Sequence, residues 1–208
     1  MPAPRPLLVL GTNNAKKREE LVDLLVPYGF ELRILSEYPQ AIEVEETGST
    51  FAENARLKAS VQAKNLGVWV LAEDSGLAVD ALEGRPGVFS ARYSGPNATD
   101  ESNNRKLLDE LAGIPLERRT AQYVCCAALA DPQGNIRAES EGTCRGRIRF
   151  EPVGTGGFGY DPLFEILEYH RTFAELGGAV KSAISHRARA LQRMVPQLLA
   201  LVRSGAWS

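Results

Sequence analysis

The feature that most constrains this chain is the stretch 68–80, which reads Val-Trp-Val-Leu-Ala-Glu-Asp-Ser-Gly-Leu-Ala-Val-Asp. Its opening residues, 68–72, are apolar and predict a short strand buried on both faces. Two adjacent carboxylates, Glu73 and Asp74, follow directly. Because carboxylates are rarely buried without a partner, we expect the strand to stop there. Both acids would then lie at the open rim of a sheet, where α/β proteins usually bind ligands. A polar turn built on Ser75 and Gly76 is the structural alternative.

Composition limits the classes of protein. The chain has 208 residues, 44% of them hydrophobic, which suits a single domain spanning 1–208 with a sizeable core. A formal net charge of −2 gives no long-range field for gathering nucleic acid or a membrane surface, so we expect neither as a partner. Three cysteines without a CxxC spacing favour a reducing compartment, and no apolar run approaches the ~20 residues of a membrane helix. We therefore expect a cytoplasmic protein, with the proline-rich residues 1–6 as a disordered lead-in.

The first strand, expected at 7–10, leads into a polar loop with two adjacent lysines at 11–17, and a helix follows. One of Thr12, Asn13 and Asn14 is expected to cap this helix. A lysine-bearing loop before a helix N-terminus can bind an anion, because free backbone N–H groups and the helix dipole both favour phosphate. An ordinary helix start fits the same residues, and the Walker spacing is absent.

An acidic loop precedes the second helix. Three acids lie within 43–46, and Thr50 with Glu53 forms a capping box that begins the helix. Lys58 lies four residues after Asn54, so the two share a helix face. An acidic cluster of this kind is commonly a solvated loop, and such a lysine is commonly a surface side chain. The position of Lys58 just after the acids also makes it a candidate for phosphate binding.

The stretch 154–162 is the second unusual feature, with four glycines around Phe158 and Tyr160. Glycine lets a backbone approach a ligand closely, and aromatic rings offer flat faces on which a base can stack. A flexible loop anchored by the two rings is the alternative. Further on, His186 and Arg187 begin the last helix, where cations oppose the helix dipole. A bound anion would resolve that conflict.

The order of the remaining elements predicts the fold. Strands are expected at 30–35, 119–131 and 136–144, the last two as a hairpin, and a helix is expected at 100–112. Strands and helices alternate up to residue 80, before the hairpin. We therefore predict an α/β fold with a mixed central sheet flanked by helices. We expect it to form two lobes with the active-site cleft between them.

These stretches together resemble the inosine triphosphate pyrophosphatase family, the nucleotide hydrolases of the dITP/XTP type. The matching motifs, in order along nearly the whole chain, are 12–17, 45–58, 73–77, 86–93, 156–162 and 181–187. The combination is specific although no single motif is. Two positions depart from the family pattern: Glu73 stands where Asp is frequent, and Val180 stands before Lys181 where an acid is frequent. Neither affects Asp74.

The resemblance implies Mg²⁺-dependent hydrolysis of a purine nucleoside triphosphate with a deaminated base (ITP, dITP or XTP) to the monophosphate and pyrophosphate, by a homodimer. It gives Asp74 the catalytic role of orienting or deprotonating water and places it near the metal. One of Glu45 and Glu46 would join it there, because neighbours in an extended loop point oppositely. The implied substrate-binding residues are Thr12, Asn13, Asn14, Ala15, Lys16, Lys17, Lys58, Ser75, Phe158, Gly159, Tyr160, Asp161, Lys181, His186 and Arg187.

Two other functions stay open. One is a related pyrophosphatase that acts on modified pyrimidine nucleotides, and the motifs 156–162 and 181–187 favour purines over it. The other is a nucleotide-binding regulatory module without turnover. The acid pair argues against such a module, because carboxylates repel a triphosphate unless a metal intervenes.

Overall fold

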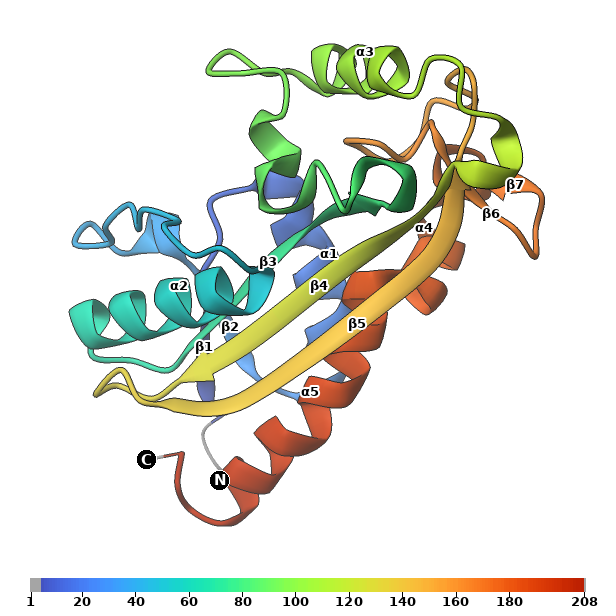
Figure 1. Ribbon diagram of the computed structural model, residues 1–208. Helices are drawn as coiled ribbons and strands as arrows, with labels where there is room; N and C mark the ends of the chain where they lie inside the picture. Colours follow the sequence, from blue (N-terminus) through green and yellow to red (C-terminus); the bar gives the residue numbers. More distant parts are fainter. Residues whose placement is uncertain (1–4, 208) are drawn as a thin grey trace. The chain divides into compact units, whose positions relative to one another are not determined.

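The computed structural model of the chain describes residues 5–207, so the expected lead-in at 1–6 lies largely outside it. Within these residues the strands form one sheet in the order β2-β1-β3-β4-β5-β6-β7 (Figure 1). The sheet contains parallel and antiparallel pairs and is flanked by helices, so the predicted mixed α/β fold is confirmed. The strands are β1 (Leu7–Leu10), β2 (Glu31–Ile34), β3 (Val70–Val79), β4 (Thr120–Ala130), β5 (Ile136–Ile148), β6 (Phe164–Ile166) and β7 (Arg171–Thr172). The α-helices are α1 (Ala15–Leu25), α2 (Phe51–Leu66), α3 (Asp100–Glu110), α4 (Phe173–Ile184) and α5 (His186–Arg203). Short 3₁₀ helices are η1 (Val26–Tyr28), η2 (Leu35–Glu37), η3 (Asp80–Leu82), η4 (Gly87–Arg92) and η5 (Leu116–Arg118).

The chain divides into two compact units, each with its own apolar core. The first unit comprises residues up to Asp74, then 125–142, and the chain from Arg187 onward. The second comprises 75–124 and 143–186. A single domain over 1–208 and a cleft between two lobes stay predictions.

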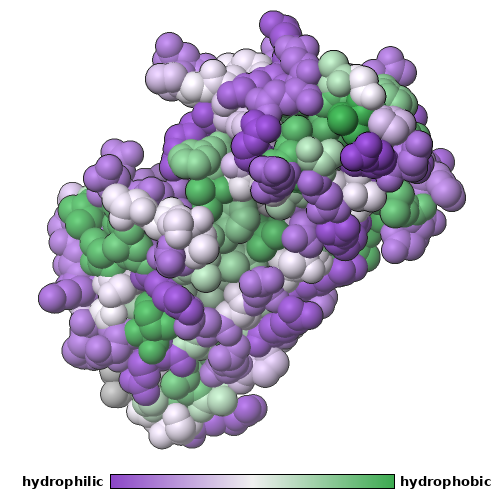
Figure 2. Space-filling model, in the orientation of Figure 1, coloured by the Kyte–Doolittle hydropathy of each residue, from purple (hydrophilic) through white to green (hydrophobic). Residues whose placement is uncertain are grey.

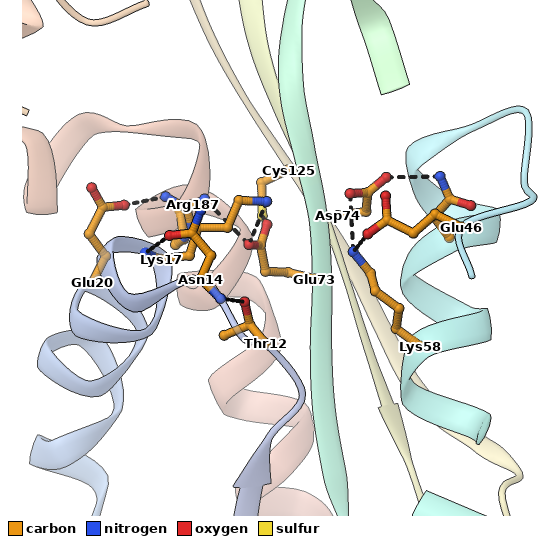
Figure 3. Close-up of polar contacts among 11 residues, drawn as sticks. Thr12, Asn14, Lys17, Glu20, Glu46, Lys58, Glu73, Asp74, Cys125 and Arg187 are labelled. Carbon is orange, nitrogen blue, oxygen red and sulfur yellow. Dashed lines mark hydrogen bonds and ion pairs between the residues drawn. The ribbon is translucent and has the colours of Figure 1, made fainter. Parts of the chain in front are cut away.

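In the first unit β1 pairs in parallel with both neighbours, so that Leu7 lies opposite Glu31 and Val9 opposite Val70. Helices α1 and α5 lie on one face of β3 and α2 on the other (Figure 3). An apolar stripe of α5 is buried with the β1 side chains in the core. Its buried members are Leu191, Met194, Val195 and Leu198.

Local capping signals begin both N-terminal helices as predicted. Of the three candidate caps of α1, Asn14 fills the role: its side-chain oxygen accepts the backbone N–H of Lys17 at 3.1 Å. Thr50 and Glu53 form the capping box of α2, and Gly67 ends it with φ +66°. Helix α1 therefore begins directly after the loop that leaves β1, with its first-turn N–H groups at that end of the strand.

The second unit is built around rings and aliphatic side chains. Phe164 of β6 stacks on Phe173 of α4 with ring centroids 5.6 Å apart, and Leu77 and Leu107 belong to the same core. Strands β6 and β7 continue the sheet beyond β5 in antiparallel pairs. Neither was predicted. The expected hairpin partner β5 is four residues longer than predicted and ends at Ile148.

Strand β3 does not stop at its acids, and this prediction was wrong. It continues through Glu73 and Asp74, whose exposed fractions are only 2% and 5%. Carboxylates are rarely buried without a partner, and here each has a cation beside it, Lys17 for Glu73 and Lys58 for Asp74. The acids are therefore held inside the unit. Ser75 follows them on the strand and is half-buried.

Candidate active site

The two acids of β3 belong to separate clusters of side chains. Successive side chains of a strand point to opposite faces. Glu73 accordingly points toward α1 and α5, whereas Asp74 points toward α2 (Figure 3). Both clusters lie within the first unit. Adjacent carboxylates thus have different partners, and each needs its own description.

The Asp74 cluster joins two carboxylates through one ammonium group. Lys58 Nζ lies 3.1 Å from Asp74 Oδ1 and 2.7 Å from Glu46 Oε1. Asn54 Nδ2 donates to Asp74 Oδ2 at 3.1 Å, which confirms that Asn54 and Lys58 share a helix face. The oxygen of the Asn54 amide accepts the N–H of Gly48 at 2.8 Å, so the amide orientation is fixed.

Burial changes the protonation equilibria of this cluster. It raises the pKa of Asp74, and the attraction of Lys58 opposes this only in part, while Glu46 adds to the rise. Burial alone would lower the pKa of Lys58, but the attraction of Asp74, Glu73 and Glu46 outweighs it and raises the pKa. Asp74 is thus a stronger base than an ordinary aspartate, beside a lysine that stays charged.

The structure distinguishes Glu45 from Glu46, the two adjacent acids of the loop before α2. Glu46 is half-buried and meets Asp74 through the Lys58 ammonium, whereas Glu45 is exposed. No cluster of three or more His, Cys, Asp or Glu side chains that could hold a metal occurs within 5–207. Two carboxylates do share a cation here, namely the Lys58 ammonium. The hard oxygen donors of Glu46 and Asp74 are therefore the candidate ligands for a divalent cation.

The Glu73 cluster is a buried ionic network. Lys17 Nζ and Arg187 Nη2 lie 3.2 Å and 3.4 Å from Glu73 Oε1, and Cys125 Sγ donates to Oε2 at 3.4 Å. Arg187 is also hydrogen-bonded to Glu20. Burial alone would lower the pKa of Arg187, but the attraction of Glu73 and Glu20 raises it. Burial raises the pKa of the Cys125 thiol well above its usual value.

The loop between β1 and α1, the helix that carries Lys17, leaves β1 through a position that requires glycine. A Cβ on Gly11 would lie 2.9 Å from a methyl carbon of Val70 and 3.0 Å from the Cβ of Ala72. The loop then turns locally, with the N–H of Asn14 donating to the Thr12 hydroxyl at 3.2 Å. Thr12 and Lys17 are half-buried and the intervening residues 13–16 are exposed. The predicted anion loop is thus accessible and ends at the Glu73 cluster.

In the second unit a further cluster forms around Asp161. Lys181 Nζ lies 2.6 Å from Asp161 Oδ2 and 4.2 Å from the centre of the Phe158 ring. The same oxygen accepts the backbone N–H of Phe158 at 2.9 Å. Tyr160 is buried, and its hydroxyl donates to the carbonyl of Ser90 at 2.8 Å. These predicted substrate-binding residues therefore occupy one place in the unit.

Helix α3 holds the glycine-rich loop at Gly159. Asp100 Oδ2 accepts the N–H of Gly159 at 2.8 Å, and Asn104 Nδ2 donates to its carbonyl at 3.0 Å. The loop itself depends on Gly157, which has φ +74° and whose Cβ would collide with the Asp161 carboxylate. The stretch is therefore anchored at several points, unlike the flexible loop considered from the sequence.

His186 lies in this second unit, and its ring stacks on Tyr123 with centroids 4.6 Å apart and planes 10° from parallel. The Tyr123 hydroxyl donates to Asp161 Oδ1 at 3.3 Å. Arg187, the next residue, belongs to the Glu73 cluster of the first unit. The predicted residues thus fall into three clusters, two in the first unit and one in the second.

Comparison with known proteins shows the family to which the chain belongs. A model of the Ham1 family matches residues 8–197. The chain belongs to the Ham1 family. It is 57% identical to a dITP/XTP pyrophosphatase from Rhodopirellula baltica, over 97% of each chain. It is 51% identical to a protein of the same name from Desulforamulus reducens, over 89% of this chain and 92% of that one. The resemblance found in the motifs is confirmed.

Solved structures related to this Ham1-family chain share its fold. A HAM1 protein from Coxiella burnetii is 40% identical with a TM-score of 0.85, covering 93% of this chain and 98% of that one. A dITP/XTP pyrophosphatase from Mycobacterium abscessus is 44% identical with a TM-score of 0.75, covering 92% and 99% of the two chains. These relatives therefore share the α/β fold of this chain.

No helix in the described part of this Ham1-family chain is long and apolar enough to cross a membrane. On the face seen in Figure 2, hydrophilic side chains (purple) predominate and apolar ones (green) are interspersed. The exposed large apolar residues are Val26, Tyr28, Ile42, Phe89, Phe150, Leu167 and Tyr169.

Several residues of the clusters in this Ham1-family chain were not predicted. Tyr123 and Cys125 lie in the apolar pattern of the strand expected at 119–131, where a core position is the ordinary expectation. Nothing in that pattern indicated their contacts with Asp161 and Glu73. Glu20 lies on α1 outside every motif, so the motifs did not indicate its contact with Arg187. The other contacts that sequence reasoning missed come from Asn54, Ser90, Asp100 and Asn104.

Proposed function

We propose that this Ham1-family chain hydrolyses the deaminated purine nucleotides ITP, dITP and XTP to the monophosphate and pyrophosphate. The observation that carries the proposal is the buried base Asp74, joined to Glu46 by the Lys58 ammonium. Relatives named dITP/XTP pyrophosphatase that are 46–57% identical to the chain support the substrate class.

The metal of this reaction is proposed to be Mg²⁺, held by Asp74 and Glu46. Mg²⁺ commonly takes one or two protein carboxylates and completes its shell with water and phosphate oxygens, so two carboxylates suffice. When bound, it would withdraw charge from the phosphate oxygens and relieve their repulsion of the acids. Lys58 pairs with both carboxylates in this structure. With the metal held by these carboxylates, its ammonium group would be available to bind the phosphates.

The chemical step is assigned to Asp74. Its carboxylate takes a proton from the water that attacks the α-phosphorus, and the bond to the bridging oxygen breaks to release pyrophosphate. Asn54 fixes the orientation of the carboxylate through its amide hydrogen bond.

The cationic groups around β3 and the predicted anion loop are proposed to bind the triphosphate. Lys17 and Arg187 are held ready by Glu73, which keeps two cations together before substrate arrives. The proposed phosphate contacts are completed by Thr12, Asn13 and Asn14 of the loop, Ala15 and Lys16 at the start of α1, Ser75 and Lys181.

The base is assigned to the cluster around Asp161. Phe158 would stack on the purine, and Gly159, Tyr160, Asp161, His186 and Arg187 would line its edge. A site that donates to a 6-keto oxygen rejects a 6-amino group, because opposed donors are left unpaired. That rule gives the preference over ATP, whereas guanine shares the 6-keto oxygen and differs from hypoxanthine by its 2-amino group. A homodimer and a cytoplasmic location remain part of the proposal.

The deciding assay measures pyrophosphate release from ITP, XTP, dITP, ATP, GTP and a modified pyrimidine triphosphate, with Mg²⁺ and after EDTA treatment. We expect kcat/KM for the deaminated purines to exceed that for ATP and GTP, and EDTA to abolish turnover. Faster turnover of the pyrimidine would favour the related pyrophosphatase. Tight binding of ITP without any turnover would favour the regulatory module.

A further inference from the structure

We propose that Tyr123 is a positioning residue for base recognition, fixing Asp161 through its hydroxyl and His186 through its ring. The inference rests on the proposed function, since both partners are assigned to the base. Tyr123 lies on β4, is 7% exposed, and belongs to the apolar core of the second unit. Its contacts join two parts of the chain that lie far apart in sequence.

The hydroxyl of Tyr123 acts on the orientation of the Asp161 carboxylate. Oδ2 of this carboxylate binds Lys181 at 2.6 Å and the N–H of Phe158 at 2.9 Å. Oδ1 accepts the Tyr123 hydroxyl at 3.3 Å. A carboxylate held at both oxygens cannot turn about its terminal bond without breaking contacts. Tyr123 thereby helps to hold Lys181 and the backbone at Phe158 in one arrangement.

The ring of Tyr123 acts on His186. The two rings stack nearly parallel, at 4.6 Å between centroids and 10° between planes. Such a stack restricts rotation of the imidazole about its side-chain bonds. His186 is 4% exposed and is the first residue of α5. A base edge that meets this imidazole therefore meets it in a defined orientation.

The phenol stays a donor under working conditions. Burial, with the charge of Asp161, raises the pKa of Tyr123 well above its usual value. The hydroxyl is therefore protonated at neutral and moderately alkaline pH and does not repel the carboxylate. The ring also contacts Phe164 at 4.7 Å between centroids, so packing has to be separated from positioning in any test.

The test compares Tyr123→Phe with wild type on ITP and ATP. The variant keeps the ring and removes one oxygen, so packing and the His186 stack persist. We expect KM for ITP to rise about tenfold, near the lower end for loss of a hydrogen bond to a charged group. We expect kcat to stay within about twofold. The preference for ITP over ATP in kcat/KM should fall as well.

The matched control is Tyr93→Phe. Tyr93 is 8% exposed, lies in the same unit, and donates its hydroxyl to the Glu110 carboxylate at 2.7 Å. Tyr93→Phe therefore loses the same type of hydrogen bond, from a tyrosine hydroxyl to a carboxylate, but at a place away from Asp161. We expect its KM and its ITP preference to match wild type. A similar KM change in both variants would overturn the positioning role and indicate a general loss of packing.

A double-mutant cycle with Asp161→Asn tests the route of the effect. If the hydroxyl acts through Asp161, adding Tyr123→Phe to Asp161→Asn should raise KM by much less than tenfold. Full additivity would overturn the inference, as would wild-type KM and selectivity in Tyr123→Phe. The proposed function is judged separately, because its failure would be seen as absent ITP turnover in the wild-type enzyme.

Discussion

Replacing Asp74 with asparagine should abolish most of the activity while leaving the fold intact. Asparagine keeps the shape but has one acceptor oxygen where Asp74 uses two, one toward Lys58 and one toward Asn54. The Asn54 amide cannot turn to compensate, because its oxygen is already bound to the N–H of Gly48. One hydrogen bond is therefore lost, together with the proton acceptor of the proposed chemistry.

The two consequences differ in size. Loss of a general base commonly lowers kcat by ~10²–10⁴-fold, so we expect a fall of at least about 100-fold, or roughly 2.7 kcal/mol in the barrier. The stability change should be about 1 kcal/mol or less, because the lost bond is offset by removal of a buried charge. Steady-state kinetics on ITP and urea unfolding measure the two separately.

The sign of the pH dependence follows from the raised pKa. A carboxyl whose folded pKa lies above its ordinary value of 3.8 contributes stability at acid pH and loses that contribution as pH rises through the folded pKa. Asp74→Asn should therefore gain stability relative to wild type between about pH 4 and neutrality.

Asp80→Asn is the control, because this carboxylate follows β3 and binds Thr120 and Arg145 on the surface. Its kcat should be that of wild type. Near-normal kcat in Asp74→Asn would refute the reasoning and move the base to Glu73 or to the Glu45–Glu46 pair.

Three further outcomes follow from the same contacts. Glu46→Gln should raise the Mg²⁺ concentration for half-maximal activity by about tenfold or more, and Glu45→Gln should change it little; equal effects in a Mg²⁺ titration would contradict the assignment of Glu46. Phe158→Ala should raise KM for ITP and ATP alike, in line with ~1–3 kcal/mol of stacking per base, with kcat little changed; a fall in kcat alone would remove the stacking role. Glu73→Gln should lower the free energy of unfolding by about 3 kcal/mol, because Arg187 loses a buried counter-charge. The exposed control Glu31→Gln should leave the urea midpoint unchanged, and an unchanged midpoint in both would show that the Glu73 network adds no stability.

The sequence predicted those parts of the fold whose signals are local. The cap at Asn14 and the capping box at Thr50 and Glu53 depend on residues within a few positions of each other. Strands β6 and β7 have three and two residues, too few for a pattern, and exist because β5 offers its edge for pairing. Their formation is a tertiary effect.

The candidate site also combines features that were predictable from the sequence with features that depend on tertiary contacts. The motifs named most of the residues that cluster, but not their partners. Whether β3 could carry two buried acids depended on Lys17, Lys58 and Arg187, which come from three different helices. The choice of Glu46 over Glu45 depended on the position of Lys58. Tyr123 had no signal at all, since an aromatic residue in an apolar strand is ordinarily core.

The alternation of β3 also explains why Glu73 is compatible with a role for Asp74. The two side chains point to opposite faces, so the extra methylene of glutamate at position 73 extends toward Lys17 and Arg187 and away from Lys58. A longer acid on that face can reach a lysine and an arginine at once, and it leaves the surroundings of Asp74 unchanged. The departure from aspartate should therefore alter how the two cations are held and leave the base itself unaffected. Glu73→Asp should accordingly change KM for ITP, through the phosphate contacts, more than it changes kcat.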